Sequence, residues 1–177
     1  NIKNLIIGKR SNLSKVLNLH ISNSVILSTT EILEKKFKRN YFVKKNNINL
    51  IINSFFPSYK LNKISNYEVF INKAILDITK ILNVFPAKKI NKIFFTSSSS
   101  VNFLDKISLN QSKYTNREIY SLTKILCEKI IIKFSKNNNI QYIITRPYNI
   151  YGGDETFSMI YKIIKSYKMK EILTINN

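Results

Sequence analysis

The chain lacks the residues that build disulfide frameworks and cysteine-based metal sites. It has one cysteine, Cys127, and one histidine, His20, among 177 residues. A single cysteine cannot form an intrachain disulfide, and a structural zinc site needs about four cysteine or histidine ligands held together in space. The sequence therefore excludes a disulfide-stabilised domain and a cysteine-based metal centre, and we expect a reduced, cytoplasmic setting.

Glycine, proline and long apolar runs are also scarce. The chain has 3 Gly and 3 Pro and no glycine-rich or serine-rich linker, so we expect residues 1–177 to form a single domain. No apolar run approaches the ~20 residues that a membrane-spanning helix needs. The apolar start is interrupted too early, by Gly8, Lys9 and Arg10, to serve as a secretory signal. These absences predict no membrane partner.

Carboxylates are the scarcest charged groups, with 10 Asp and Glu against 29 Lys and Arg, and the formal net charge is +19. Such a balance is typical of proteins that bind nucleic acids or anionic membranes. It is also expected from AT-rich codons, which favour the Lys, Asn and Ile that dominate this chain. The lysines are spread along the sequence, and no zinc-finger or RRM-type motif is present. We therefore favour compositional bias, expect no specific nucleic-acid partner, and keep a basic nucleic-acid-binding protein as an alternative.

Short apolar runs alternate with segments of helical periodicity. Five runs have the length of a strand and are apolar almost throughout: Lys3–Ile7, Ser24–Ser28, Asn49–Asn53, Lys92–Thr96 and Gln141–Thr145. Runs of this kind are typical of strands buried on both faces of a parallel sheet. Apolar residues recur at helical spacing between the runs, in Leu13–Leu19, Val69–Leu82 and Ile119–Phe134. The alternation predicts an α/β fold, a Rossmann-like doubly wound parallel sheet with helices on both faces.

Two parts of this arrangement can be specified further. The apolar stripe of the third predicted helix consists of Ile119, Leu122, Leu126, Ile130 and Phe134. Beyond the fifth run, we expect Thr156–Lys168 to be helical and Glu171–Ile175 to form one more short strand.

The first run leads into a turn that could open a helix against a phosphate. In a dinucleotide-binding fold this turn contains glycines, which let the backbone approach the pyrophosphate, and the helix N-terminus donates N–H groups to it. Here Gly8 is followed by Ser11 and Ser14 where the G-x-x-G-x-x-G pattern has glycines. A plain strand-to-helix turn is an equally good interpretation of this segment.

Three charged residues bear on the choice of cofactor at such a turn. Lys9 and Arg10 could meet the pyrophosphate or the 2′-phosphate of NADP, although two solvated cations are the simpler interpretation. Glu31, the one acid near the end of the second run, is a late candidate for binding the adenosine ribose. The sequence therefore leaves NAD and NADP open.

Tyr120 and Lys124 form the strongest local pattern. Four residues apart on a predicted helix, they lie one turn from each other on the same face. A phenol has a pKa of about 10, and a nearby ammonium favours the phenolate and lowers that pKa. Such a tyrosine can exchange a proton with a hydroxyl or carbonyl group while a nicotinamide exchanges a hydride. The serines of Ser97–Ser100 follow the fourth run directly and could hold the reacting oxygen.

Four motifs, in order along the chain, are similar to those of one enzyme family. Phe94–Val101 resembles a strand-and-serine motif, Tyr120–Lys124 a Y-x-x-x-K pair, and Arg146–Gly152 an R-P-x-N-V-Y-G segment. Asn72 matches an asparagine in the helix before the serine strand. Y-x-x-x-K alone is common by chance in a chain with 10 Tyr, and the order of the four motifs makes the resemblance specific. Over essentially its whole length, the chain resembles the extended short-chain dehydrogenases of the NAD-dependent epimerase/dehydratase family.

The resemblance implies an NAD(P)-dependent epimerase/dehydratase or reductase acting on a nucleotide-diphosphate sugar, with a homodimer as a candidate assembly. It assigns catalysis to Ser98, Tyr120 and Lys124, where Tyr120 is the general acid/base and Lys124 lowers its pKa and binds the nicotinamide ribose. The residues expected to contact NAD or NADP are Gly8, Ser11, Leu13, Asn53, Ser54, Phe55, Lys124, Pro147 and Tyr148. Ser98 and Asn149 are expected to contact the substrate, and no metal is implied.

Departures from the family's pattern keep another function open. Two glycines of the turn are serines, and Asn102-Phe103 replaces the Tyr-Gly that often follows the serine motif. Phe55-Phe56 replaces the alanines usual after the third strand, a bulk that could narrow the cofactor groove. These changes favour, as an alternative, a non-catalytic dinucleotide-binding or interaction module on the same fold. No acid follows the serine motif before Asp105, which favours epimerisation or reduction over dehydration.

Members of this family continue well beyond the length of this chain, with further strands and a helical substrate lobe. We therefore expect either a fragment or a minimal form, in which residues 152–177 are the start of a substrate-side extension. Asn1 in place of an initiator methionine favours a partial chain.

Overall fold

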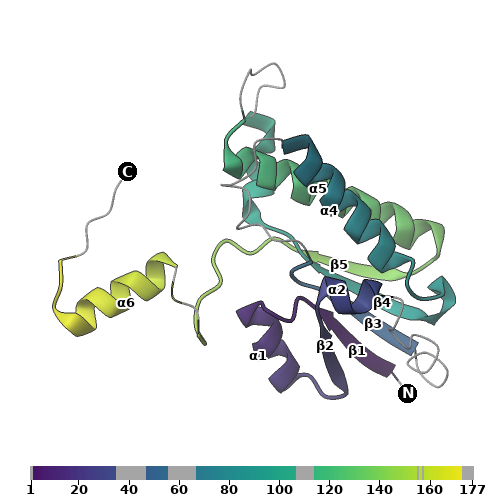
Figure 1. Ribbon diagram of the computed structural model, residues 1–177, viewed down its shortest axis with the longest axis horizontal. Coiled ribbons are helices and arrows are strands. Elements are labelled where there is room, and N and C mark those ends of the chain that lie inside the picture. The colour runs from purple at the N-terminus through teal and green to yellow at the C-terminus, as the bar shows by residue number, and fades with distance from the viewer. Residues whose placement is uncertain are drawn as a thin grey trace.

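Five parallel strands form one sheet in the part of the chain that the structure describes (Figure 1). The structure, a computed structural model, describes residues 2–34, 47–55, 67–106, 114–154, 156 and 158–172, with the backbone alone for 104–106. The strands are β1 (Ile2–Ile7), β2 (Ser24–Leu27), β3 (Asn47–Ile52), β4 (Ile90–Thr96) and β5 (Gln141–Thr145). Their order is β2-β1-β3-β4-β5, and every neighbouring pair is parallel.

Helices cover both faces of this sheet. The helices α2 (Thr29–Leu33), α4 (Tyr67–Leu82) and α5 (Asn116–Asn137) lie on one face, and α1 (Asn12–His20) lies on the other, as Figure 1 shows. Two 3₁₀ segments, η2 (Ala87–Lys89) and η3 (Ser99–Lys106), flank β4, and α6 (Met159–Met169) extends away from the sheet. The predicted Rossmann-like, doubly wound arrangement is therefore confirmed.

The chain changes direction across the sheet at β1. From β1 it moves outward to β2 and then returns to β3 on the other side, so that Leu5 pairs with both Val25 and Leu50. In open sheets of this kind, ligands bind outside the carboxyl ends of the strands where the order reverses. Gly8 follows β1 at that edge and Asn53 follows β3, so the topology alone brings the two segments together.

The burial of the strands differs between the centre and the edge of the sheet. Leu5, Ile6 and Ile7 of β1 are completely buried, as a strand covered on both faces must be. The edge strand β5 instead alternates between exposed and half-buried residues, and Ile143 is 43% exposed. The prediction of burial on both faces is therefore right for the end of β1 and wrong for β5. The described helices cover the β5 region on one face only.

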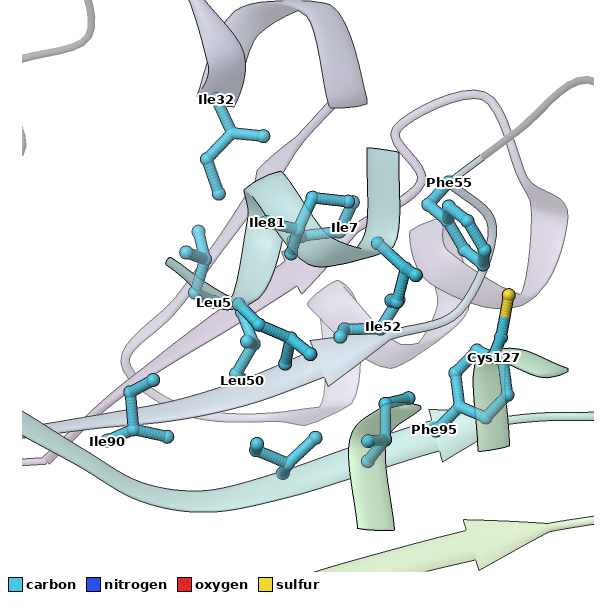
Figure 2. Close-up of a cluster of buried hydrophobic side chains, with 14 of the residues drawn as sticks. Leu5, Ile7, Ile32, Leu50, Ile52, Phe55, Ile81, Ile90, Phe95 and Cys127 are labelled. Atoms are coloured by element: carbon cyan, nitrogen blue, oxygen red, sulfur yellow. The ribbon is translucent and has the colours of Figure 1, made fainter. Parts of the chain in front are cut away.

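The main apolar core lies between the sheet and the helices α4 and α5 (Figure 2). Leu50 of β3, Phe95 of β4 and Ile81 of α4 are buried in it, and Cys127 contributes from α5. Burial raises the pKa of the Cys127 thiol to about 12, so the side chain acts as a small apolar residue there. Phe55 also turns its ring into this core beside Phe95, with the ring centroids 6.2 Å apart.

The buried face of α5 is not the predicted one. Of the five residues in the predicted stripe only Ile119 is buried, and the other four are half-buried. The deeply buried positions lie elsewhere on the helix: Ser121, Thr123, Lys124, Cys127, Glu128, Ile131 and Ser135. Polar residues are tolerated there because two hydroxyls bond the helix itself, Ser121 to the Arg117 carbonyl and Thr123 to the Ile119 carbonyl. The helix also packs against α4, so its buried surface is wider than one stripe.

The last segment begins and ends differently from the prediction. The helix starts at Met159 rather than at Thr156, because the Ser158 hydroxyl accepts a hydrogen bond from the Tyr161 N–H as its N-cap. Glu171 and Ile172 are not in a strand, and the rest of the predicted strand lies outside the described residues. No helix in the described ranges is long and apolar enough to cross a membrane. These ranges also contain no group of His, Cys, Asp and Glu residues arranged to hold a metal ion.

We expect Leu50→Ala to lower the free energy of unfolding by about 2–5 kcal/mol, because it leaves a cavity between β3 and the helices. The side chain is completely buried. Leu19→Ala is the matched control, since Leu19 is 80% exposed on α1 and its truncation should cost less than about 0.5 kcal/mol. Urea unfolding followed by circular dichroism measures both, and equal losses would contradict the assigned core.

Candidate active site

A groove of about 1410 Å³ runs along the carboxyl edge of the sheet. It is lined by the segments that follow each of the five strands and by the face of α5 above them. The residues predicted to form the site all line this groove: Gly8, Ser11, Leu13, Asn53, Ser54, Phe55, Ser98, Tyr120, Lys124, Pro147, Tyr148 and Asn149. Segments from the two ends of the described sequence therefore meet at one edge, where α/β sheets of this order bind their ligands.

Gly8 fixes the turn after β1 against the end of β3. Its φ of 124° lies outside the range that other residues adopt. A Cβ at this position would lie 2.7 Å from the Ser54 carbonyl oxygen and 2.8 Å from the Ser54 nitrogen. The Gly8 N–H donates to the Leu27 carbonyl at 2.8 Å, which ties the turn to β2 as well. A side chain at this position would therefore push the turn away from the end of β3.

The two serines of the turn take part in a side-chain network. The Asn53 amide donates to the Ser11 hydroxyl at 2.9 Å and to the Ser14 hydroxyl at 2.7 Å. Ser11 has a φ of −74°, so the turn needs no left-handed residue at this position and a serine adopts it without strain. Asn53 and Ser14 are buried. The substitution of glycine by serine is thus compensated by hydrogen bonds to the end of β3.

The start of α1 fits an anionic ligand. Ser11 is the N-cap of the helix, but its side chain makes no capping hydrogen bond, because it is turned toward Asn53. The first N–H groups of the helix are therefore not satisfied by that side chain, and the first turn contains no acid. Lys9, Arg10 and Lys15 also line the groove at this end. The residues present fit the pyrophosphate of a dinucleotide.

Asn12 joins this turn to the segment after β5. Its amide donates to the Gly152 carbonyl oxygen at 2.6 Å, and its carbonyl oxygen accepts from the Asp154 N–H at 3.4 Å. A Cβ on Gly153 would lie 2.9 Å from the Asn12 amide. Sequence reasoning missed Asn12, since nothing in the local pattern reveals a partner 140 residues away.

Lys124 is buried beneath the groove. Its Nζ donates to the Thr96 carbonyl oxygen at 2.8 Å and lies 4.9 Å from the centroid of the Phe95 ring and 5.7 Å from that of Tyr120. Burial lowers the pKa of Lys124 to about 8, and the nearby Glu128 carboxylate opposes that shift. The lysine therefore changes its protonation near neutral pH and is held by strand β4 and aromatic faces.

Tyr120 lies one turn before Lys124, and burial raises the pKa of its phenol because the phenolate is poorly solvated there. The Lys124 Nζ lies 5.7 Å from the centroid of the Tyr120 ring, and the lowering of the phenol pKa by this cation stays a prediction. The tyrosine is consequently a protonated acid in this arrangement. Formation of its phenolate requires the cation's field to outweigh the cost of burial.

Ser98 is presented by a loop that is anchored to β5. The Ser97 N–H donates to the Thr145 carbonyl at 2.7 Å, and the Ser99 N–H donates to the Pro147 carbonyl at 3.1 Å. The Ser98 hydroxyl accepts from the Ser100 hydroxyl at 2.9 Å and is half-buried. Ser97 and Ser99 are buried, so alternate serines of the run face inward while Ser98 reaches the groove.

An ion pair between the exposed Arg146 and the buried Glu128 holds α5, β5 and the serine loop together. The Arg146 guanidinium donates to both Glu128 carboxylate oxygens, at 3.0 and 2.6 Å, and to the Asn102 side-chain oxygen at 2.9 Å. The Glu128 side chain is only 3% exposed, so the fork-shaped contact satisfies a carboxylate that water does not reach. Glu128 lies one turn beyond Lys124, a spacing visible in the sequence, but its pairing with Arg146 was missed.

A reversing parallel sheet, a glycine turn after its first strand and a Tyr–Lys pair over its carboxyl edge define a Rossmann-like α/β domain of the dinucleotide-binding class. The chain belongs to the NAD dependent epimerase/dehydratase family, whose model matches residues 5–176. The family expected from the sequence is therefore confirmed, and NAD or NADP is confirmed as the cofactor of that family. No curated protein sequence matches the chain.

Solved structures show the same fold at low sequence identity. A GalE-like L-threonine dehydrogenase from Cupriavidus necator (holo form) has a TM-score of 0.71 and 11% identity, over 96% of this chain and 63% of that one. A UDP-glucuronic acid 4-epimerase from Bacillus cereus in complex with NAD has a TM-score of 0.63 and 15% identity, over 98% and 65%. A GDP-L-fucose synthetase from Naegleria fowleri bound to NADP has a TM-score of 0.64 and 14% identity, over 99% and 65%. The chain thus spans about two thirds of these structures, and half of another, DdhaC.

We expect Gly8→Ala to be more destabilising than Gly152→Ala. Both glycines have a positive φ, 124° and 105°, so alanine costs about 1–3 kcal/mol in backbone strain at either position. Only at Gly8 would the new Cβ also meet backbone atoms, since no atom lies within 4 Å of a Cβ on Gly152. Gly8→Ala should therefore lose at least about 1 kcal/mol more in urea unfolding. Equal losses would show that the turn can move away from β3.

The burial of Lys124 predicts a specific dependence of stability on pH. Its pKa falls from 10.5 to about 8 on folding, so between these values the unfolded chain binds more protons and stability rises with pH. The free energy of unfolding should rise by roughly 3 kcal/mol relative to Lys124→Met as the pH increases from 8 to 10.5. Lys129→Met, at an exposed position of the same helix, controls for the change in net charge. Parallel profiles for the wild type and Lys124→Met would refute the burial of a titrating lysine.

Proposed function

We propose that the chain is the cofactor-binding part of an NAD(P)-dependent enzyme that epimerises or reduces a nucleotide-activated sugar. The observation that supports this most directly is the meeting of Ser98, Tyr120 and Lys124 in one groove with the turn at Gly8. Those three side chains come from the end of β4 and from α5, and the turn comes from β1. A proton-transfer group and a phosphate-binding turn are thus placed along one continuous surface.

The dinucleotide, when bound, supplies hydride exchange with a carbon atom of the sugar. Tyr120 moves the proton of the adjacent sugar hydroxyl through its phenol oxygen. Ser98 holds that oxygen by a hydrogen bond from its hydroxyl, which the Ser100 contact keeps in place. Lys124 supplies the positive charge that favours the phenolate. Its hydrogen bond to the Thr96 carbonyl oxygen fixes the position of the ammonium relative to Tyr120.

The cofactor residues follow the order of the strands. Gly8, Ser11 and Leu13 lie at the start of α1 and are proposed to hold the pyrophosphate through their backbone. The segment Asn53–Phe55 passes the adenosine side, where the Phe55 ring turns into the core beside Phe95 and so leaves its backbone to line the groove. Pro147 and Tyr148 flank the nicotinamide. The Phe55 bulk that could have narrowed the groove is accommodated in the interior.

The substrate side is formed by the segment after β5. Tyr148 is 74% exposed and Asn149 is exposed, and both line the groove beyond the serine loop. We assign Asn149 to the substrate and residues 152–177 to the start of a substrate-side extension. A sugar nucleotide fits the positive charge of the chain, and the B. cereus and N. fowleri structures bear the names of enzymes of UDP- and GDP-sugars. A homodimer in the cytoplasm stays a prediction from the sequence.

A non-catalytic dinucleotide-binding module is the second candidate function. The raised pKa of the Tyr120 phenol favours it, because a tyrosine that stays protonated cannot accept a proton from a hydroxyl. In this case the wild-type chain would bind NAD or NADP and convert no nucleotide sugar. Calorimetry combined with product analysis over UDP- and GDP-sugars separates the two functions.

Tyr120→Phe should lower kcat by about 10²- to 10⁴-fold, because it removes the oxygen that exchanges the proton. Its affinity for the cofactor should stay within about twofold of the wild type, since the ring remains. Tyr142→Phe on β5, which is partly buried against the core, removes a hydroxyl outside the groove and should leave kcat unchanged. Turnover is measured by NMR of the sugar product, and full activity of Tyr120→Phe would overturn the catalytic assignment.

A further inference from the structure

The acid that could bind the adenosine ribose is turned away from the groove. Glu31 is the third residue of α2, and one carboxylate oxygen accepts from the Ser28 N–H at 2.7 Å as part of a capping box. The other oxygen pairs with the Lys9 ammonium at 2.6 Å. These two contacts lower the pKa of Glu31 to about 2. Glu31 is not among the residues that line the groove.

This position decides which dinucleotide fits. In Rossmann domains that bind NAD, an acidic side chain near the end of the second strand accepts hydrogen bonds from the ribose hydroxyls. Its carboxylate would also repel a phosphate at the 2′ position. Both oxygens of Glu31 bind the Ser28 N–H and the Lys9 ammonium. The carboxylate is therefore not available to the ribose hydroxyls, and its repulsion of a 2′-phosphate is reduced.

Cationic and hydroxyl groups line the groove instead. Arg10 lies in the turn after β1, is exposed and lines the groove, and forms no ion pair with any residue that the structure describes. Ser28 and Thr30 line the same end and offer hydroxyl groups. A guanidinium bonds phosphate through two parallel N–H groups, and a ribose diol offers it no comparable partner. The charge of Lys9 is offset by Glu31, whereas none of the described carboxylates forms an ion pair with Arg10.

The other charged groups at this end do not reverse the balance. Asp77 of α4 is buried and pairs with Lys73 at 3.0 Å. Glu34, at the end of α2 and about one helical turn past Glu31, is exposed and lines the groove, where its charge is opposed by that of Arg10. Lys15 adds a further cation on the α1 side.

We infer that the groove selects a 2′-phosphorylated dinucleotide, NADP, with the Arg10 guanidinium on the 2′-phosphate and the Ser28 and Thr30 hydroxyls beside it. The inference rests on the proposed function, since it assigns the cofactor of the same site. It resolves the choice between NAD and NADP that the sequence leaves open.

Calorimetry at about 0.15 M salt, where long-range attraction to a basic protein is screened, tests the inference. The wild-type chain should bind NADP at least about tenfold more tightly than NAD. The half-molecules 2′,5′-ADP and 3′,5′-ADP have the same charge, and the first should bind at least about tenfold more tightly because only its phosphate meets Arg10. Equal binding of the two would show a general preference for anions and overturn the inference.

Two variants locate the selectivity. Arg10→Ala should lower the affinity for NADP about tenfold and leave that for NAD within about twofold, whereas Arg117→Ala, on α5 outside the groove, should change neither. Glu31→Gln keeps a side chain that suits the capping box, and it should not weaken the binding of either dinucleotide. A tenfold loss of NAD affinity in Glu31→Gln would overturn the inference. If the wild type binds neither NAD nor NADP, the proposed function itself is refuted.

Discussion

The close approach between the turn after β1 and the end of β3 is the constraint on which the site depends. Gly8 places its backbone against that of Ser54, and the Asn53 amide holds the Ser11 and Ser14 hydroxyls. These contacts cross the sheet where its order reverses, so they set where α1 begins. A turn farther from β3 would aim the first N–H groups of the helix past the groove. The phosphate end of the site is therefore a product of strand packing as much as of the turn.

The reacting end is held by a second set of contacts, which act through charge. Arg146 at the end of β5 binds Glu128 of α5 and Asn102 of the segment after β4. Because a buried carboxylate without its cation is costly, the pair keeps the helix that bears Tyr120 and Lys124 at a fixed height over the strand ends. Asn12 then links the two ends by reaching the Gly152 carbonyl. The groove thus has three independent attachments along its length.

Much of the fold could be predicted because parallel strands are apolar almost throughout and helices alternate with them. Most of the predicted site residues meet in the groove because they follow strands that end at one edge, and Tyr120 and Lys124 reach it from α5. The predicted apolar stripe of α5 was wrong because apolar periodicity counts only apolar residues. The Ser121 and Thr123 hydroxyls bond carbonyls of their own helix, so these polar residues can be buried as well. Asn12 and the partner of Glu128 depend on contacts between distant segments and leave no local pattern. The hydrogen bond of Glu31 to the Ser28 N–H could have been predicted, since Ser28 and Glu31 have the spacing of a capping box.

The 3 glycines of the chain all lie at positions with a positive φ. A sequence rich in lysine and asparagine uses those residues even in left-handed backbone, at Asn23, Asn139 and Lys170, with φ between 52° and 55°. Glycine is kept at 8 and 152, where φ exceeds 100°, and at 153, where a side chain would strike Asn12. Gly8 lines the groove, and Gly152 and Gly153 lie against Asn12 at the start of α1. Lysine and asparagine serve elsewhere, so glycine stands at the described positions where the backbone angle or the neighbouring atoms exclude a side chain.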